Sequence, residues 1–313
     1  MKISVIIPTR NAERYLENLI KSLLNQTVNP DEIIIIDTES SDRTKQIAQQ
    51  YDKIEFVQIT QNEFGHGKTR NYAAKLATGD ILVFITQDAC PQNNGVMEEL
   101  IKPLGKNNVV CTYGKQIPNK DSNIIEIFSR NFNYGDSDII KSKEDIKRLN
   151  IKTFFFSNVC SAYIKEEFFR VGGFPEDVIM NEDMIIAAKF IFNDKKTYYA
   201  SNAKVFHSHT YSYVQQFKRN FDIGVVFVDS SKYFFGIKAE SEGIRFVKEA
   251  LKYLVKNNKI WLIPNLIMES GFKFIGHLCG KNYKKLPKKL VKKMSMHSFY
   301  FDIKELSAVE NKS

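Results

Sequence analysis

The chain has 313 residues, of which 43% are hydrophobic and 26% charged, so it can bury a large core and is neither disordered nor collagen-like. Its net charge of +9 is concentrated: residues 241–300 carry 13 lysines and arginines against three acids, whereas residues 1–240 hold 30 of each sign. A neutral body with one basic segment argues against a nucleic-acid-binding protein and suggests a local attachment surface.

The cysteines and the first residues bear on the cellular compartment. Four cysteines, at positions 90, 111, 160 and 279, lack both the CxxC pairs of zinc sites and the density of a disulfide framework. The apolar run at residues 3–7 is too short for the core of a signal peptide and is interpreted as a buried first strand. We therefore expect reduced thiols and a cytoplasmic protein.

Residues 1–115 alternate short apolar runs with helical patterns. This alternation predicts right-handed crossovers and a mostly parallel sheet, and the runs of isoleucine and valine favour strands covered on both faces. The predicted strands are 3–7, 32–37, 54–59, 81–86 and 109–113, and the predicted helices are 12–25, 68–77 and one from the Ser40-Ser41-Asp42 cap to residue 50.

The rhythm changes after residue 115. From about 116 to 240 the pattern is mixed α/β, which we expect to continue the same sheet, and from 241 onward it is helical and basic. The predicted strands of the middle region are 154–164, 197–200 and 204–207, and its predicted helices are 166–171, 183–192 and 213–224.

Polar residues follow three strands of the predicted sheet, with Thr9 after the first, Asp37 after the second and Asp88 after the fourth. In an open parallel sheet, ligands bind outside the carboxyl ends of the strands. Two acids at this edge favour a nucleotide or metal site, although each acid could instead cap the turn that follows it. No glycine-rich dinucleotide motif or P-loop occurs, so bound phosphates need another counter-charge, such as a divalent cation held by Asp88.

Four motifs occur in order along the chain: Val5-Ile6-Ile7-Pro8-Thr9-Arg10-Asn11, Asp37-Thr38-Glu39-Ser40-Ser41-Asp42-Arg43-Thr44, Thr86-Gln87-Asp88-Ala89 and Asn181-Glu182-Asp183. Together they resemble the inverting glycosyltransferases of family 2, which have the GT-A fold, and the resemblance covers about residues 2–225.

Further motifs refine this resemblance: Glu63-Phe64-Gly65-His66-Gly67-Lys68-Thr69-Arg70-Asn71, Gln87-Asp88-Ala89, and His207-Ser208-His209 followed by Gln215-Gln216-Phe217-Lys218-Arg219. Within the family they are similar to those of bacterial rhamnosyltransferases, which build surface polysaccharides from dTDP-rhamnose.

The resemblance implies an α/β architecture of the GT-A type. Its Rossmann-like, mostly parallel central sheet would be flanked by helices and followed by a helical, basic C-terminal extension. We expect a catalytic domain at 1–240, with a nucleotide-binding half at 1–115 and an acceptor-binding half at 116–240, and the extension at 241–313.

The resemblance also implies donor-binding roles residue by residue. Thr9 corresponds to the first-strand residue that contacts the base, and Asp37 to the acid that accepts a hydrogen bond from the pyrimidine N3–H. Arg70 corresponds to the arginine of the Arg-Asn pair that opens the third helix, and Gln87 belongs to the same nucleotide-binding set. Because thymine and uracil present the same hydrogen-bonding edge, these positions do not separate dTDP from UDP.

The metal site is implied in the same way. The family's DxD motif, whose last acid meets the metal, corresponds to Gln87-Asp88-Ala89, and His207 matches a metal-ligating histidine of related enzymes. Asp88 and His207 are thus the implied ligands of Mg²⁺ or Mn²⁺, and the amide in place of the first acid weakens cation binding. The candidates for contact with the donor sugar or diphosphate are His66, Lys68 and His209.

Asp183 matches the catalytic base of the family, and Glu182 its neighbour. An acceptor hydroxyl is a poor nucleophile, so a carboxylate must take its proton as it attacks the anomeric carbon. The nucleoside diphosphate leaves with negative charge, which a cation or basic side chains must meet. One base opposite the leaving group gives inversion in a single displacement. The alternative is that both acids are ordinary first-turn residues of a helix.

The C-terminal segment combines apolar and basic helix faces. Such helices are typical of proteins bound at an anionic membrane surface, so we expect peripheral attachment; the alternatives are packing on the catalytic domain or an oligomer interface. Residues 260–280 are apolar but contain Pro264, Glu269 and Lys273, which disfavours a membrane span. The apolar positions are Ile244, Val247, Leu251 and Leu254 in a first helix and Leu286, Leu290, Val291 and Met294 in a second.

The sequence therefore predicts an inverting enzyme that transfers L-rhamnose from dTDP-rhamnose to a lipid-linked or growing surface polysaccharide at the inner face of the cell membrane. We expect a nucleotide-sugar donor, a glycan acceptor and an anionic membrane as partners, no nucleic acid, and leave oligomerisation open. The alternatives are a UDP-sugar-dependent enzyme of the same fold, a non-catalytic membrane scaffold, and a nucleotidyltransferase, which would need a basic loop after the first strand where only Arg10 occurs.

Overall fold

The computed structural model describes residues 1–119, 121–209, 211–234 and 240–302. The chain forms two compact units, the first made of residues 1–176 and 182–208 and the second of residues 177–181 and those from 209 onward. The predicted extension at 241–313 includes residues 303–313, which lie outside the described residues.

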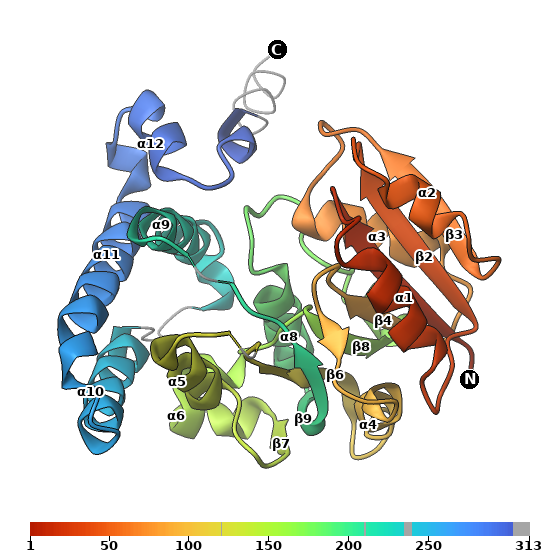
Figure 1. Ribbon diagram of the computed structural model, residues 1–313, viewed down its shortest axis with the longest axis horizontal. Coiled ribbons are helices and arrows are strands. Elements are labelled where there is room, and N and C mark those ends of the chain that lie inside the picture. The colour runs from red at the N-terminus through yellow and green to blue at the C-terminus, as the bar shows by residue number, and fades with distance from the viewer. Residues whose placement is uncertain (120, 210, 235–239, 303–313) are drawn as a thin grey trace. The chain divides into compact units, whose positions relative to one another are not determined.

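The first unit alternates strands and helices in the order that the sequence predicts for residues 1–115 (Figure 1). Its elements are β1 (Ile3–Thr9), α1 (Leu16–Leu24), β2 (Glu32–Thr38), α2 (Thr44–Ala48), β3 (Ile54–Ile59), α3 (His66–Leu76), β4 (Ile81–Ile85), β5 (Cys90–Pro91), α4 (Val96–Ile101), β6 (Val109–Ile117), α5 (Ile124–Asn133), β7 (Ile139–Lys141), α6 (Ile146–Leu149), β8 (Cys160–Ile164), α7 (Lys165–Arg170), α8 (Glu182–Phe192) and β9 (Lys196–Phe206).

The strands described in this unit belong to one sheet, with the order β3-β2-β1-β4-β8-β6-β9-β5 and with β7 paired to β9. Strands β1 to β4 are parallel, and β8 runs antiparallel to both β4 and β6, so β6 and its parallel partner β9 point the same way as β4. The carboxyl ends of β1, β2, β4 and β9 therefore meet at one edge of the sheet. This confirms the predicted α/β class and the continuation of the sheet beyond residue 115.

Successive residues of the central strands point to opposite faces, and both faces are buried. In β1, Val5 and Ile7 pack into one apolar cluster with α1, α2 and α4, whereas Ile6 packs into a second cluster with α3, α7 and α8. A strand covered on both faces needs apolar residues at every position, which explains the uninterrupted isoleucine and valine runs. The sequence pattern of β1, β2 and β4 is thus the direct result of two helix layers.

Two local predictions differ from the structure. The two strands predicted at 197–200 and 204–207 are one strand, β9, in which Ser201 donates to Asp138 and the register with β6 shifts between Gly114 and Lys115. The strand predicted at 154–164 begins only at Cys160. Within the preceding segment, the backbone N–H of Asn158 donates to the Asp183 carboxylate instead of to a neighbouring strand.

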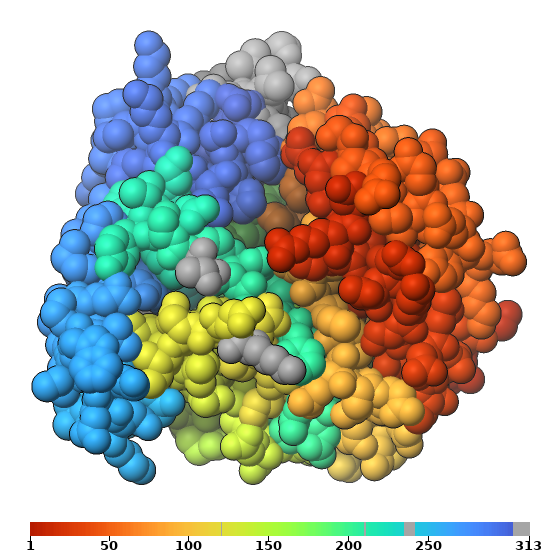
Figure 2. Space-filling view, in the orientation of Figure 1, coloured from red at the N-terminus to blue at the C-terminus, as the bar shows by residue number. Residues whose placement is uncertain are grey.

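The second unit is helical over its described residues, and in the space-filling view its teal and blue elements form a continuous surface (Figure 2). Its α-helices there are α9 (Tyr213–Asp229), α10 (Glu240–Lys256), α11 (Ile263–Lys281) and α12 (Lys288–Met294). No described helix combines the length and apolar character that crossing a bilayer requires.

Helices α9 and α11 pack closely against each other. A Cβ atom on Gly276 would lie 2.3 Å from the Phe217 carbonyl oxygen, and one on Gly280 would lie 2.0 Å from that of Phe221. Only glycine permits such an approach of two helix backbones. Helix α9 therefore packs with α11, and both helices belong to the second compact unit.

Candidate active site

The nucleotide-binding residues predicted from the first two strands lie side by side. Thr9 and Asp37 are register partners in β1 and β2, and the Thr9 hydroxyl donates to Asp37 Oδ1 over 2.9 Å. The other Asp37 oxygen accepts from the backbone N–H of Ser40 at 2.9 Å, so the carboxylate fixes the loop that follows β2. Asp37 is only 1% exposed.

Gln87 connects the ends of β1 and β4. Its Oε1 accepts from the backbone N–H of Arg10 at 2.8 Å, and its Nε2 donates to the Arg10 carbonyl at 3.1 Å. A carboxylate at this position could accept the first hydrogen bond but could not donate the second. This two-way contact is a structural reason for the amide that replaces the first acid of the DxD pattern.

Asp88 and His207 approach each other from the ends of β4 and β9. His207 Nε2 lies 3.6 Å from Asp88 Oδ1; His207 is buried and Asp88 is half-buried. One carboxylate and one imidazole form a donor set that suits divalent transition metals such as Mn²⁺. His209, two residues further along the chain, belongs to the second unit.

A buried network fixes which nitrogen of His207 carries a proton. His207 Nδ1 lies 2.9 Å from Gln116 Oε1, and Arg130 also donates to this oxygen, while Gln116 Nε2 donates to Ser157 Oγ at 2.8 Å. Because an arginine only donates, the Gln116 atom that it contacts must be the oxygen, and Nδ1 must then be protonated. In the neutral ring, Nε2 therefore turns a lone pair toward Asp88, as a metal-ligating histidine requires.

Asp183 lies in the first turn of α8 and is half-buried. One of its carboxylate oxygens accepts from the backbone N–H of Asn158 at 3.2 Å, and the other from that of Met184 at 2.8 Å. Burial and the neighbouring negative charge of Glu182 raise the pKa of Asp183 to about 7. A carboxyl with this pKa can accept a proton near neutral pH.

Glu182 has the opposite environment. Burial opposes its ionisation, but the guanidinium of Arg70, 3.3 Å away, lowers the pKa of the Glu182 carboxyl below its usual value. Both side chains are less than a tenth exposed, and Asn158 Nδ2 donates to Glu182 at 3.2 Å. Two adjacent carboxyls with diverging pKa values are typical of sites that divide acid–base roles.

The remaining predicted residues lie around α3. Arg70 donates to the carbonyl of His66 at 2.9 Å in addition to its pairing with Glu182. The His66 ring meets Phe64 edge-on, with ring centres 5.3 Å apart, and Lys68 is exposed in the first turn. The structure thus brings Arg70 to the acids of α8.

Three residues of the site were missed by sequence reasoning: Gln116 and Asn158, which are buried, and Arg130, which is half-buried. Asn158 contacts both acids of α8, and its Oδ1 accepts from Tyr163 Oη at 2.7 Å. The one signal in the sequence is that Ser157 and Asn158 interrupt an otherwise apolar run, which should have marked a break before β8.

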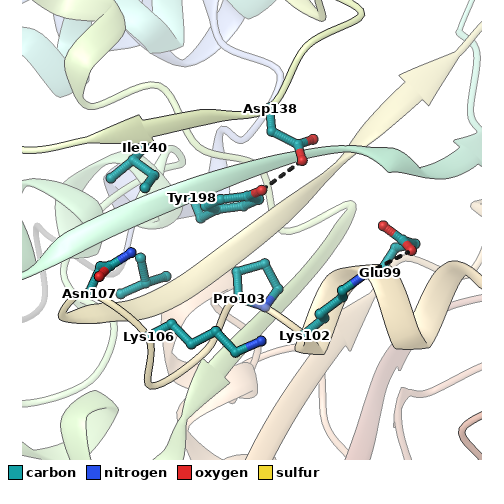
Figure 3. Close-up of a pocket in the computed structure, with 9 residues that line it drawn as sticks. Glu99, Lys102, Pro103, Lys106, Asn107, Asp138, Ile140 and Tyr198 are labelled. Carbon is teal, nitrogen blue, oxygen red and sulfur yellow. Dashed lines mark hydrogen bonds and ion pairs between the residues drawn. The ribbon is translucent and has the colours of Figure 1, made fainter.

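A separate pocket of about 210 Å³ lies between α4 and the beginnings of β6 and β9 (Figure 3). Lys102, Lys106 and Tyr198 line it, and Tyr198 Oη donates to Asp138 Oδ2 at 2.6 Å. It lies toward the amino ends of these strands, whereas His207 follows the carboxyl end of β9. None of the predicted site residues lines it.

Comparison with known proteins agrees with this geometry. A family model described as glycosyl transferase family 2 matches residues 4–170. The chain is 39% identical over 306 residues to the O-antigen chain rhamnosyltransferase RfbN of Salmonella typhimurium, covering 96% of each chain. It is 40% identical over 304 residues to the O-antigen chain rhamnosyltransferase WbaN of Salmonella anatum, covering 96% of this chain and 95% of that one.

Two solved structures share the fold. TarS of S. aureus in complex with UDP has a TM-score of 0.55 at 19% identity, covering 91% of this chain and 92% of that chain. The mannosyltransferase PcManGT from Pyrobaculum calidifontis, in complex with GDP-Man and Mn²⁺, has a TM-score of 0.56 at 16% identity, covering 100% and 88%. With the family model and the two Salmonella relatives, the fold shows that this chain is a glycosyltransferase and belongs to glycosyl transferase family 2.

Proposed function

We propose that this glycosyltransferase moves L-rhamnose from dTDP-rhamnose to a lipid-linked or growing surface polysaccharide by a single inverting displacement. The rhamnosyl donor is supported by the likeness to two O-antigen chain rhamnosyltransferases over nearly the whole chain. The single geometric observation that carries the reaction is the pair of carboxyls at the start of α8: Asp183, which accepts from the backbone N–H groups of Asn158 and Met184, and Glu182, which lies 3.3 Å from Arg70.

In this mechanism Asp183 is the general base. The acceptor hydroxyl loses its proton to the Asp183 carboxylate as its oxygen forms the bond to the anomeric carbon of rhamnose, and the bond from that carbon to the dTDP oxygen breaks. The N–H groups of Asn158 and Met184 hold the carboxylate in place, and Glu182 keeps its pKa high. Glu182 takes no proton in this step.

We propose that Thr9 and Asp37 bind the pyrimidine, that Arg70 and Gln87 shape the nucleotide site, and that His66 and Lys68 lie near the diphosphate. Gln87 would act by fixing the loop that follows β1, since the oxygen and the nitrogen of its side-chain amide both bind the Arg10 backbone. The exposed position of Lys68 in the first turn of α3 supports its proposed place near the diphosphate.

Asp88 and His207 would hold a divalent cation, Mg²⁺ or Mn²⁺, and the protonation of His207 Nδ1 fits them for it. When bound, such a cation offsets the negative charge that develops on the leaving diphosphate.

Replacing Gln116 with Met should weaken cation binding about 10- to 100-fold, because the proton on His207 Nδ1 loses its acceptor and the ring its orientation. Mn²⁺ titration followed by electron paramagnetic resonance, without any donor, measures this directly. Gln116→Glu keeps an acceptor between Arg130 and His207 and should bind Mn²⁺ nearly as the wild type does. Equal affinity in the Met variant would show that Gln116 does not position the ligand.

A donor screen tests the proposed substrate. Thermal stabilisation should be larger with dTDP-rhamnose than with UDP- or GDP-sugars at equal concentration, since a ligand that binds the native state stabilises it more as its affinity rises. Release of dTDP should then require an acceptor glycan. Preferential stabilisation and turnover with a UDP-sugar would instead establish the alternative, a UDP-sugar-dependent enzyme of the same fold.

We also propose that the enzyme works at the inner face of the cell membrane, where a lipid-linked acceptor would be presented. The basic second unit supports this location, because its surplus of lysines matches the charge of anionic lipids.

A further inference from the structure

Helix α11 and the turn before it expose a continuous apolar face. Ile267, Phe274 and Leu278 lie on one side of the helix, seven and four residues apart, and expose 57%, 62% and 50% of their surface. The opposite side contains Gly276 and Gly280, which pack against α9. The α11 face consists of Ile260, Trp261, Ile267, Met268, Phe274, Ile275 and Leu278.

We propose that the α11 face lies flat in the interface of an anionic membrane, with its apolar side chains at the boundary of headgroups and acyl chains. An apolar face of this extent on a water-exposed helix marks an interaction site. The inference deepens the proposed function and rests on it, because a lipid-linked acceptor would lie at this surface. Its geometry comes from the second unit alone.

Charge decides between a membrane and a second copy of the chain as the occupant. Exposed lysines flank the face at both ends, with Lys256 before it and Lys281 and Lys285 after it. Glu269 is the one acid between residues 250 and 301, and it pairs with Lys273 over 2.6 Å. A symmetric dimer through this face would bring basic ends against basic ends, whereas anionic headgroups complement them.

Trp261 adds a feature specific to membrane interfaces. Its side chain is 63% exposed, and the Lys259 ammonium lies 4.9 Å from the ring centre. Tryptophan and lysine together are favoured at the headgroup level, where the ring is half in an apolar medium and the ammonium remains in water.

The membrane-facing residues differ from those that the sequence suggested. Leu254 of α10 is 1% exposed and Val291 of α12 is 5% exposed, so these parts of the predicted apolar faces pack inside the second unit. The sequence predicts that the segment at 260–280 does not span a membrane, because it contains Glu269 and Lys273. As a helix lying on the membrane, it keeps both of these charges off the α11 face, since the paired side chains of Lys273 and Glu269 are only 28% and 18% exposed.

The full-length protein provides its own probe, because Trp261 is its single tryptophan. Vesicles of phosphatidylcholine with phosphatidylglycerol should shift the Trp261 emission to shorter wavelength and sediment the protein, and added salt should weaken both effects. The double variant Ile267→Ser/Phe274→Ser should bind vesicles at least about tenfold more weakly, since two apolar side chains no longer enter the interface. The control Ile139→Ser, at an exposed apolar position of the first unit, should bind like the wild type.

An unchanged emission with anionic vesicles, or equal binding by the double variant, would overturn the proposal. If the wild type does not bind vesicles but forms a dimer in solution, and the double variant is a monomer, the α11 face would instead be assigned to a second copy of the chain. Vesicle binding is measured without donor or acceptor. The membrane proposal can therefore fail while the enzyme still turns over dTDP-rhamnose with a water-soluble acceptor. Failure of the proposed activity would conversely leave vesicle binding intact.

Discussion

Replacing Asp183 with Asn is expected to lower turnover about 10²- to 10⁴-fold, the usual contribution of a general base. The amide keeps the size of the side chain and one oxygen, which can accept from either the Asn158 or the Met184 N–H group, but it cannot take the acceptor proton. Donor affinity, measured by titration calorimetry, should remain within about twofold because Asp183 acts only on the acceptor. Turnover that persists in this variant would exclude Asp183 as the base.

The pH profile provides the control for this prediction. Asp183 acts in its ionised form, and its raised pKa means that the protonated, inactive form increases as the pH falls through about 7. Turnover should therefore drop about tenfold per pH unit below that value. Glu182→Gln removes the neighbouring negative charge and should shift this limb to lower pH. An unshifted limb would show that another group controls it.

Replacing Arg70 with Met is expected to destabilise the fold by about 3–5 kcal/mol, because it leaves the Glu182 carboxylate buried without its partner. Urea unfolding of the full chain measures this loss. The double variant Arg70→Met/Glu182→Leu should recover much of the stability, since no unpaired charge remains in the interior.

An exposed arginine serves as the matched control. Arg170 pairs with Glu166 and Glu167, each over 2.5 Å, but its side chain is 52% exposed and Glu167 also has Lys195 as a partner at 2.9 Å. Arg170→Met should cost less than about 1 kcal/mol, because water replaces the lost interaction. Equal costs at Arg70 and Arg170 would contradict the role given to the buried pair.

Local patterns were sufficient to predict the first half of the fold. The strands β1, β2 and β4 are buried on both faces, so their sequences are apolar throughout, and the polar residues that follow them mark the edge of the sheet. Thr9 and Asp37 could be placed together because parallel neighbours end at the same edge.

The supporting residues of the site could not be predicted in this way. Gln116 lies on β6 and Arg130 on α5. Gln116 meets His207 at the end of β9, and Arg130 meets Gln116, only through tertiary packing. A buried polar residue in a strand has no periodic signal that names its partner. The same holds for Asn158, which contacts Asp183 in the segment before Cys160, where the predicted strand is absent.

The exposed side of α11 could not be predicted for a different reason. Its sequence is apolar nearly all round, with Ile267 and Phe274 on one side and the packing glycines Gly276 and Gly280 on the other. Hydrophobicity alone cannot say which side a neighbouring helix covers. Gly276 and Gly280 identify the inner side, because they pack closely against α9.

The proposed reaction is tested most directly by nuclear magnetic resonance of the product formed from dTDP-rhamnose and an acceptor glycan. A single displacement with Asp183 as the base should give a new rhamnosyl linkage whose anomeric configuration is opposite to that of the donor. A linkage with retained configuration, or dTDP released without any rhamnosylated product, would contradict it.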